Sequence, residues 1–256
     1  MMRVLSLGWG VQSFTLAAMA ALGDIEPIDA AIHADTTHER SATYEFAAKW
    51  TPWLEAHGVR VVTVVSRNAQ TVKQVTSVKT DVPAYTYSEN GARLGQLRRQ
   101  CTHRWKVQPI RRWLQANRAG QPVTQLLGIS RDEWHRAKDS DVKYVTHVWP
   151  LLEKNMTRND CINYLERNGL EVPGKSACVF CPYHNKRAWQ DMKLENGDDW
   201  RKAVEVDEAI RKVRPPYDLF VHSSRIPLVE VDLSTPEDHG QLRLLNEECD
   251  SGYCFL

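Results

Sequence analysis

Residues 4–13, with the sequence VLSLGWGVQS, constrain the fold of this chain more than any other stretch. An apolar, β-type run breaks into small residues, and a helical apolar pattern begins at Phe14 and continues to Leu22. This order predicts a strand, a glycine loop and the N-terminus of a helix. Exposed backbone N–H groups and the positive end of the helix dipole suit such a turn to phosphate binding. A glycine turn can also serve tight packing alone, and the stretch by itself does not separate these two interpretations.

Strands and helices alternate along much of the chain. This alternation predicts an α/β fold, a parallel twisted sheet flanked by helices, with ligands at the carboxyl ends of its strands. The hydrophobic patterns predict further strands at 28–33, 59–65, 123–128 and 144–149, and helices at 41–55 and 104–118.

The remaining segments are organised differently. Residues 68–95 are polar and rich in turn formers, and we expect a mobile loop over the site. Thr157 is expected to cap a helix with Asp160 at its third position, and the C-terminal portion is helix-rich with a strand at 228–231. We therefore expect a nucleotide-binding α/β domain over 1–150 and a helix-rich, cysteine-bearing extension over 151–256.

Composition limits the kinds of partner. The chain has 256 residues and a formal net charge of +1, so any anion binding depends on local groups of charge. It contains no signal-like N-terminal segment and no long apolar run, which leads us to expect a cytoplasmic protein without a membrane partner. In that compartment the six cysteines are better interpreted as metal ligands or reactive thiols than as disulfides.

The order of several motifs resembles the nucleotide site of phosphoadenylyl-sulfate and adenylyl-sulfate reductases, which belong to the PP-loop, or adenine nucleotide alpha-hydrolase-like, superfamily. The stretch CTHRWKVQPI at 101–110 looks like the reductase pattern C-C-x-x-R-K-V-x-P-L, with Thr102 in place of the second cysteine. The other matching parts are GVQS at 10–13, ADT at 34–36 followed by TYEF at 43–46, Gly128 with Arg136, and the C-x-x-C at 178–181.

The resemblance implies an adenine nucleotide as substrate or cofactor: PAPS, APS, or ATP with Mg²⁺. It places phosphate at Ser6, Gly8, Gly10, Gln12 and Ser13, the nucleoside beside Asp35 and Thr36, and the neighbouring strand end at Gly128, with Arg131 and Arg136 neutralising phosphate or sulfate. Gln12 stands where ATP-cleaving members usually have aspartate. An amide can donate a hydrogen bond to phosphate without adding negative charge.

The cysteines imply a metal centre. Cys101, Cys178 and Cys181 resemble three ligands of the [4Fe–4S] cluster in the cluster-bearing reductases, and such a cluster normally takes four thiolates. The fourth iron position is either left open or filled by another residue. Cys161 is our candidate for the fourth ligand, and the alternative for it is a buried core cysteine. Zinc is the rival metal, since C-x-x-C with two distant cysteines also suits a structural zinc site.

The C-terminal tail resembles the reductase tail, E-C-G-[IL]-H, only in outline. Glu248 and Cys249 match, whereas Asp250 and Ser251 depart and the histidine is missing. The resemblance makes Cys249 the candidate nucleophile toward sulfur, with Cys254 as a resolving partner. The alternative is two terminal cysteines without a catalytic role.

Two further groups of residues suggest anion binding. Trp105 and Trp113 alternate with basic residues, as they would on a nucleic-acid surface, and the same charges would equally suit a sulfonucleotide or a solvated helix face. These basic residues are Arg98, Arg99, Arg104, Lys106, Arg111 and Arg112. The polar cluster HSSR at 222–225 could hold a phosphate or form a strand-edge loop.

Three functions follow as hypotheses. The first is a thiol-dependent reductase of activated sulfate, with a thiol electron donor. The second is an ATP-dependent sulfurtransferase that adenylylates and thiolates a nucleobase or nucleic acid. The third is a nucleotide-binding regulatory module without turnover. The sequence leaves the physiological substrate and the oligomeric state open.

Overall fold

The computed structural model describes residues 1–66, 72–76, 80–88, 90, 92–195, 197–235 and 238. The chain folds into two compact units, each built from two separate stretches of sequence. Unit 1 comprises 1–66 and 105–176, and unit 2 comprises 67–104 and 177–256. Among the described residues, no helix combines the length and the apolar character needed to cross a membrane.

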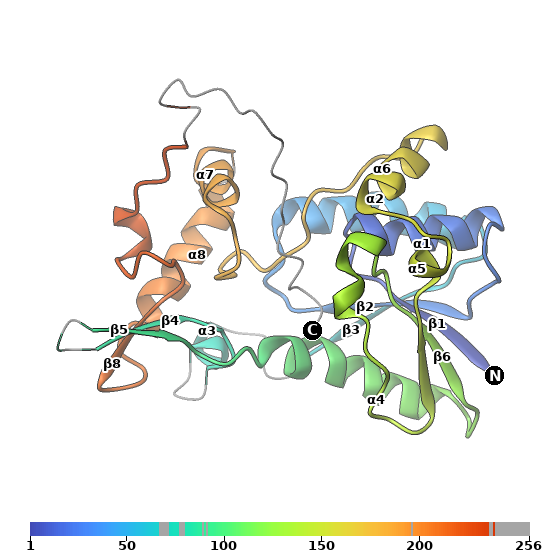
Figure 1. The fold of residues 1–256 in the computed structure, drawn as a ribbon, viewed down its shortest axis with the longest axis horizontal. Helices are drawn as coiled ribbons and strands as arrows, with labels where there is room; N and C mark the ends of the chain where they lie inside the picture. The colour runs from blue at the N-terminus through green and yellow to red at the C-terminus, as the bar shows by residue number, and fades with distance from the viewer. Residues whose placement is uncertain are drawn as a thin grey trace. The chain divides into compact units, whose positions relative to one another are not determined.

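Unit 1 contains the predicted parallel sheet. Its five strands are all parallel and lie in the order β3-β2-β1-β6-β7 (Figure 1). The strands are β1 (Met2–Ser6), β2 (Ala30–Asp35), β3 (Val61–Val65), β6 (Val123–Leu126) and β7 (Val145–Val148). The chain first extends the sheet from β1 toward β3 and later from β1 toward β7, so the order reverses between β1 and β6. In open α/β sheets, ligands bind at the carboxyl ends of the strands at such a reversal.

Helices cover both faces of this sheet, as the alternation of strand side chains requires. Figure 1 shows α1 (Val11–Leu22), α2 (Ser41–Ala56) and α6 (Arg158–Arg167) on one side of the strands and α4 (Gln108–Asn117) on the other. Leu5 and Leu7 face the α1 side, whereas Val4 and Ile32 pack with Leu114 of α4. The short helix α5 (Pro150–Glu153) also contacts α1.

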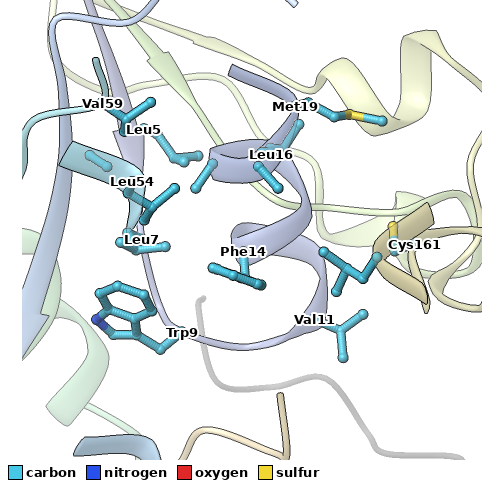
Figure 2. Close-up of a cluster of buried hydrophobic side chains, with 14 of the residues drawn as sticks. Leu5, Leu7, Trp9, Val11, Phe14, Leu16, Met19, Leu54, Val59 and Cys161 are labelled. Atoms are coloured by element: carbon cyan, nitrogen blue, oxygen red, sulfur yellow. The ribbon is translucent and has the colours of Figure 1, made fainter. Parts of the chain in front are cut away.

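The core on the α1 side is fully buried and rich in aromatic rings. Figure 2 shows the side chains of β1 and α1 meeting Leu54, Val59 and Cys161 there. The rings of Phe14 and Phe46 lie 4.8 Å apart, edge to face, and both lie 6.2 Å from the ring of Trp9. This packing fixes the start of α1 against the sheet.

Unit 2 consists of a small antiparallel sheet and helices. Its strands, in the order β5-β4-β8, are β4 (Tyr85–Ser88), β5 (Arg93–Gln96) and β8 (Tyr217–Phe220). Its helices are α3 (Val72–Val75), α7 (Lys186–Glu195), α8 (Gly197–Ile210) and the 3-10 helix η3 (Leu228–Glu230). The π-helical segment η1 (Thr102–Val107) carries the chain from unit 2 into unit 1.

Several details differ from the predictions. The division at residue 150 was wrong, because α6 packs on α1 within unit 1 while β4 pairs with β8 in unit 2. The described part of 68–95 contains α3, β4 and most of β5 instead of a loop. Residues 228–230 form a 3-10 helix and not a strand. The capping box of Thr157 and Asp160 was predicted correctly.

We predict that Phe14→Ala lowers the free energy of unfolding by about 3–5 kcal/mol, because it leaves a cavity among closely packed rings. Leu22→Ala is the matched control on the same helix: Leu22 is 41% exposed, so its loss should change stability by only about 0.5 kcal/mol. Urea denaturation of both variants measures the difference. Equal effects would contradict the assignment of Phe14 to the core.

Candidate functional site

The loop between β1 and α1 lies at the point where the strand order reverses. The first N–H groups of a helix have no partners within the helix, and Gly10, the residue before α1, has no side chain to cap them. The first turn of α1 contains no acidic residue. This end of α1 therefore offers donors and positive potential to an anion.

The loop is held in shape by its own polar groups. The N–H of Gly8 donates to Ser13 Oγ at 3.1 Å, and Ser13 Oγ donates to the carbonyl of Gly10 at 3.2 Å. Three of the predicted phosphate ligands, Gly8, Gly10 and Ser13, thus bond to one another in this structure. Ser6 Oγ accepts a hydrogen bond from Gln125 Nε2 at 2.7 Å on the neighbouring strand β6.

Trp9 and His33 stabilise the loop from the buried side, and the sequence analysis predicted neither residue to have this role. Trp9 has a left-handed backbone, with φ of 58°, which is rare for a bulky residue. Its ring is buried and lies 6.4 Å from that of His33. Burial lowers the pKa of His33, so the neutral ring donates its Nδ1–H to the carbonyl of Leu7, at 3.1 Å.

The carboxyl end of β6 approaches the start of α1 very closely. A methyl group on Gly128 would lie 2.8 Å from the backbone nitrogen of Ser13 and 3.0 Å from the carbonyl carbon of Gln12. Only glycine allows this approach without a backbone shift. The segment after β6 is therefore placed directly beside the first turn of α1.

The predicted arginines follow on the 3-10 helix η2 (Arg131–Arg136). Arg131 is exposed and its Nη1 donates to Asn155 at 3.4 Å. Arg136 is 6% exposed, and its Nη1 donates to Glu133 Oε2 at 2.6 Å. Gln12 Nε2 lies 3.4 Å from both Ser130 Oγ and Glu133 Oε2. The structure therefore brings Gln12 and Arg136 together through a carboxylate that the sequence prediction missed.

The predicted nucleoside side, at the end of β2, carries two acidic groups. Asp35 Oδ1 accepts hydrogen bonds from the N–H of Thr37 at 2.7 Å and from the phenol of Tyr44 at 2.8 Å. Thr36 Oγ1 donates to Glu39 Oε1 at 3.3 Å, and Lys106 Nζ forms a 2.9 Å ion pair with the same oxygen. Lys106 thus holds the segment after β2 in place, and its side chain does not lie on an exposed helix face.

Cys161 belongs to the apolar core of unit 1. Its exposed fraction is 0%, and Figure 2 shows it on α6 beside the side chains of α1. Burial raises the pKa of its thiol to about 12. A protonated thiol in such surroundings is a poor metal ligand, and this position matches the alternative interpretation, a core cysteine.

The other three described cysteines lie in unit 2. Cys178 and Cys181 form a tight turn, in which the N–H of Cys181 donates to the carbonyl of Cys178 at 3.0 Å. Tyr183 interacts electrostatically with both Cys181 and Cys101, and burial raises the pKa of its phenol. Thiols are suitable donors for iron or zinc, yet within the described residues no three His, Cys, Asp or Glu side chains are arranged to hold a metal. The four described cysteines as arranged do not form a complete cluster site. Cys249 and Cys254 lie outside the described residues.

Two other suggested anion sites have structural roles. Trp105 is buried and offers no stacking surface to a nucleic acid, whereas Trp113 is partly buried against the core on the α4 side. The guanidinium of Arg225 donates to the carbonyls of Thr86, Gly95 and Ser223 at 3.0–3.1 Å. Arg225 therefore links the β4–β5 hairpin to the loop at 222–225.

Comparison with known proteins gives limited guidance. No protein-family model matches this chain, and no curated protein matches it. Among solved structures, the chain is similar to the crystal structure of phosphoadenylyl-sulfate (PAPS) reductase from Candida auris in its phosphate complex. The sequences are 13% identical, the match covers 67% of this chain and 74% of that chain, and the TM-score is 0.46. A similarity of this size does not assign a function.

We predict that Gly128→Ala lowers the free energy of unfolding by about 1–3 kcal/mol, because the added methyl pushes β6 away from α1. Gly174→Ala is the matched control, since a methyl there meets no atom within 4 Å. Urea denaturation measures both. An unchanged Gly128→Ala variant would contradict the close approach.

We predict that Cys161→Ala leaves the iron, sulfide or zinc content of the purified protein unchanged and costs about 1 kcal/mol of stability. The physical reason is its place in the core of unit 1. Cys178→Ala is the comparison variant, and anaerobic purification followed by metal analysis is the measurement. Loss of metal from the Cys161→Ala protein would restore Cys161 as a ligand.

Proposed function

We propose that this chain is an enzyme that binds an adenine nucleotide with its phosphates at residues 8–13 and carries out thiol-dependent reduction of activated sulfate. The observation that carries the proposal is the uncapped start of α1 at the reversal of strand order, with the buried cation Arg136 beside it. A helix N-terminus with a neighbouring guanidinium is well suited to a phosphate or sulfate group. The motif order in the sequence supports the adenine nucleotide.

The donors at the loop are sufficient for a sulfonucleotide, whereas ATP would also bring Mg²⁺ to carboxylates that have partners within the chain. Magnesium bound with ATP usually takes one or two protein carboxylates. In the described structure Asp35 accepts from Tyr44, Asp132 accepts from the N–H of Arg158 at 3.0 Å, and Glu133 is paired with Arg136. A phosphosulfate needs no metal ion for its recognition, because N–H groups and a guanidinium are sufficient donors.

In the proposed reaction a cysteine thiolate attacks the sulfur of the sulfonucleotide. A sulfur–sulfur bond forms, the bond between sulfur and the bridging oxygen breaks, and AMP or its 3′-phosphate leaves with the electron pair. A second thiol then attacks the cysteine sulfur, a disulfide forms, and sulfite is released. Cys249 is the proposed nucleophile, from the resemblance of its surroundings to the reductase tail. This chain's loop would hold the leaving phosphate.

The test is to incubate reduced full-length protein with APS or PAPS and excess dithiothreitol, and to assay sulfite together with AMP or its 3′-phosphate. We expect sulfite from at least one of the two nucleotides and none from Cys249→Ser. Cys254→Ser is the matched control in the same tail and should still release AMP or its 3′-phosphate.

Two outcomes would contradict the proposal. Sulfite release by Cys249→Ser at the wild-type rate would exclude this thiol as the nucleophile. Absence of sulfite from either nucleotide, together with pyrophosphate release from ATP only when RNA or DNA is added, would replace the reductase with the sulfurtransferase.

A further inference from the structure

A carboxylate lies beside the first turn of α1, where the proposed nucleotide would place an anionic group. Glu133 Oε2 accepts from Arg136 Nη1 at 2.6 Å and lies 3.4 Å from Gln12 Nε2. Its side chain is only 15% exposed. One oxygen of Glu133 thus faces two of the donors that the proposed site offers to its ligand.

The donors themselves are not free to move away. Arg136 is 6% exposed, and its buried Nε has no hydrogen-bond partner in the described structure. Ser130, which Gln12 also contacts, is fully buried, and Gly128 fixes this segment against α1. An anion that binds beside Arg136 at this place therefore lies close to the Glu133 carboxylate, which already holds Nη1 of the guanidinium and, when ionised, repels the anion.

We propose that Glu133 is an internal competitor for the anionic group of the nucleotide: it holds Arg136 and Gln12 when the site is empty and releases them when the nucleotide binds. The inference rests on the proposed function and adds a residue that sets the affinity of that site. It also predicts that neutralising Glu133 strengthens binding, which is the reverse of what loss of an ordinary ligand contact would do.

The electrostatics of Glu133 give the competition a pH dependence. Burial raises the pKa of Glu133. The charged groups that face it are Arg136 and Asp132 on η2 and Arg158 on α6, whereas Gln12 on α1 is neutral. Below its raised pKa the carboxyl group is uncharged and competes poorly. Nucleotide affinity should therefore rise as the pH falls through that value.

The test is calorimetric titration with APS, both acidic groups of which stay ionised between about pH 5 and pH 8. At the upper end of this range we expect Glu133→Gln to bind APS about tenfold more tightly than wild type, which is the usual size of one charge-assisted hydrogen bond. Wild-type affinity should increase toward the lower end, and the Glu133→Gln variant should lose this dependence. Glu153→Gln, an exposed carboxylate on α5, is the control and should behave as wild type.

The outcomes separate this inference from the proposed function. If neither wild type nor Glu133→Gln binds APS, and neither binds PAPS in the same titration, the proposed function fails. If APS binds wild type with the same or higher affinity than Glu133→Gln, the function stands and the competition is overturned. Should Glu133→Gln fail to fold, a wild-type affinity that does not change with pH overturns the inference equally well.

Discussion

The close contact between Gly128 and the first turn of α1 is the constraint on which the candidate site depends. A backbone without a side chain allows β6 to approach within a distance that a methyl group would block. Because β6 is the neighbour of β1 on the far side of the strand reversal, this contact places η2 beside the loop. Without it, Arg136 and Glu133 would not reach Gln12.

A second constraint is the buried ring of Trp9. A left-handed backbone costs a bulky residue of order 1–3 kcal/mol, and such a conformation persists only where its surroundings fix it. The rings of Phe14 and Phe46 provide that packing, and the hydrogen bond from His33 to Leu7 holds the strand end. The loop therefore depends on an apolar anchor as much as on its glycines.

The sequence made the sheet of unit 1 predictable and much of unit 2 unpredictable, for physical reasons. β2 and β6 are apolar runs followed by local breaks, and the Thr157 capping box is a local signal. β4 is short and polar, and it pairs with β8, more than 100 residues later in the chain. No local pattern contains that pairing, so the segment was mistaken for a loop.

The candidate site likewise depends on contacts that no local sequence pattern reveals. Motif order predicted the glycine loop and Arg136 as site residues, whereas it did not predict Glu133 as the partner of Arg136. An acid three residues before an arginine is common on exposed helices, where the pair contributes little. Here the side chains are only 6% and 15% exposed, and this burial depends on the packing of the segment after β6 against α1, which the local sequence does not reveal. Trp105 illustrates the opposite case, because its basic neighbours indicated a surface and its ring lies in the core.

The charge balance of the site follows from these contacts. Four carboxylates at or shortly after the ends of β2 and β6 accept a hydrogen bond from the chain itself: Asp35 from Tyr44, Glu39 from Thr36, Asp132 from the N–H of Arg158 and Glu133 from Arg136. An anion entering such a site gains the helix N-terminus at once, but beside Arg136 it meets the Glu133 carboxylate that already holds Nη1 of the guanidinium. Since two anions close together in a partly buried place repel each other, an ionised Glu133 lowers the affinity of the site for an anionic ligand. The effect of the Glu133 charge on ligand affinity is therefore a consequence of the packing between the segment after β6 and α1.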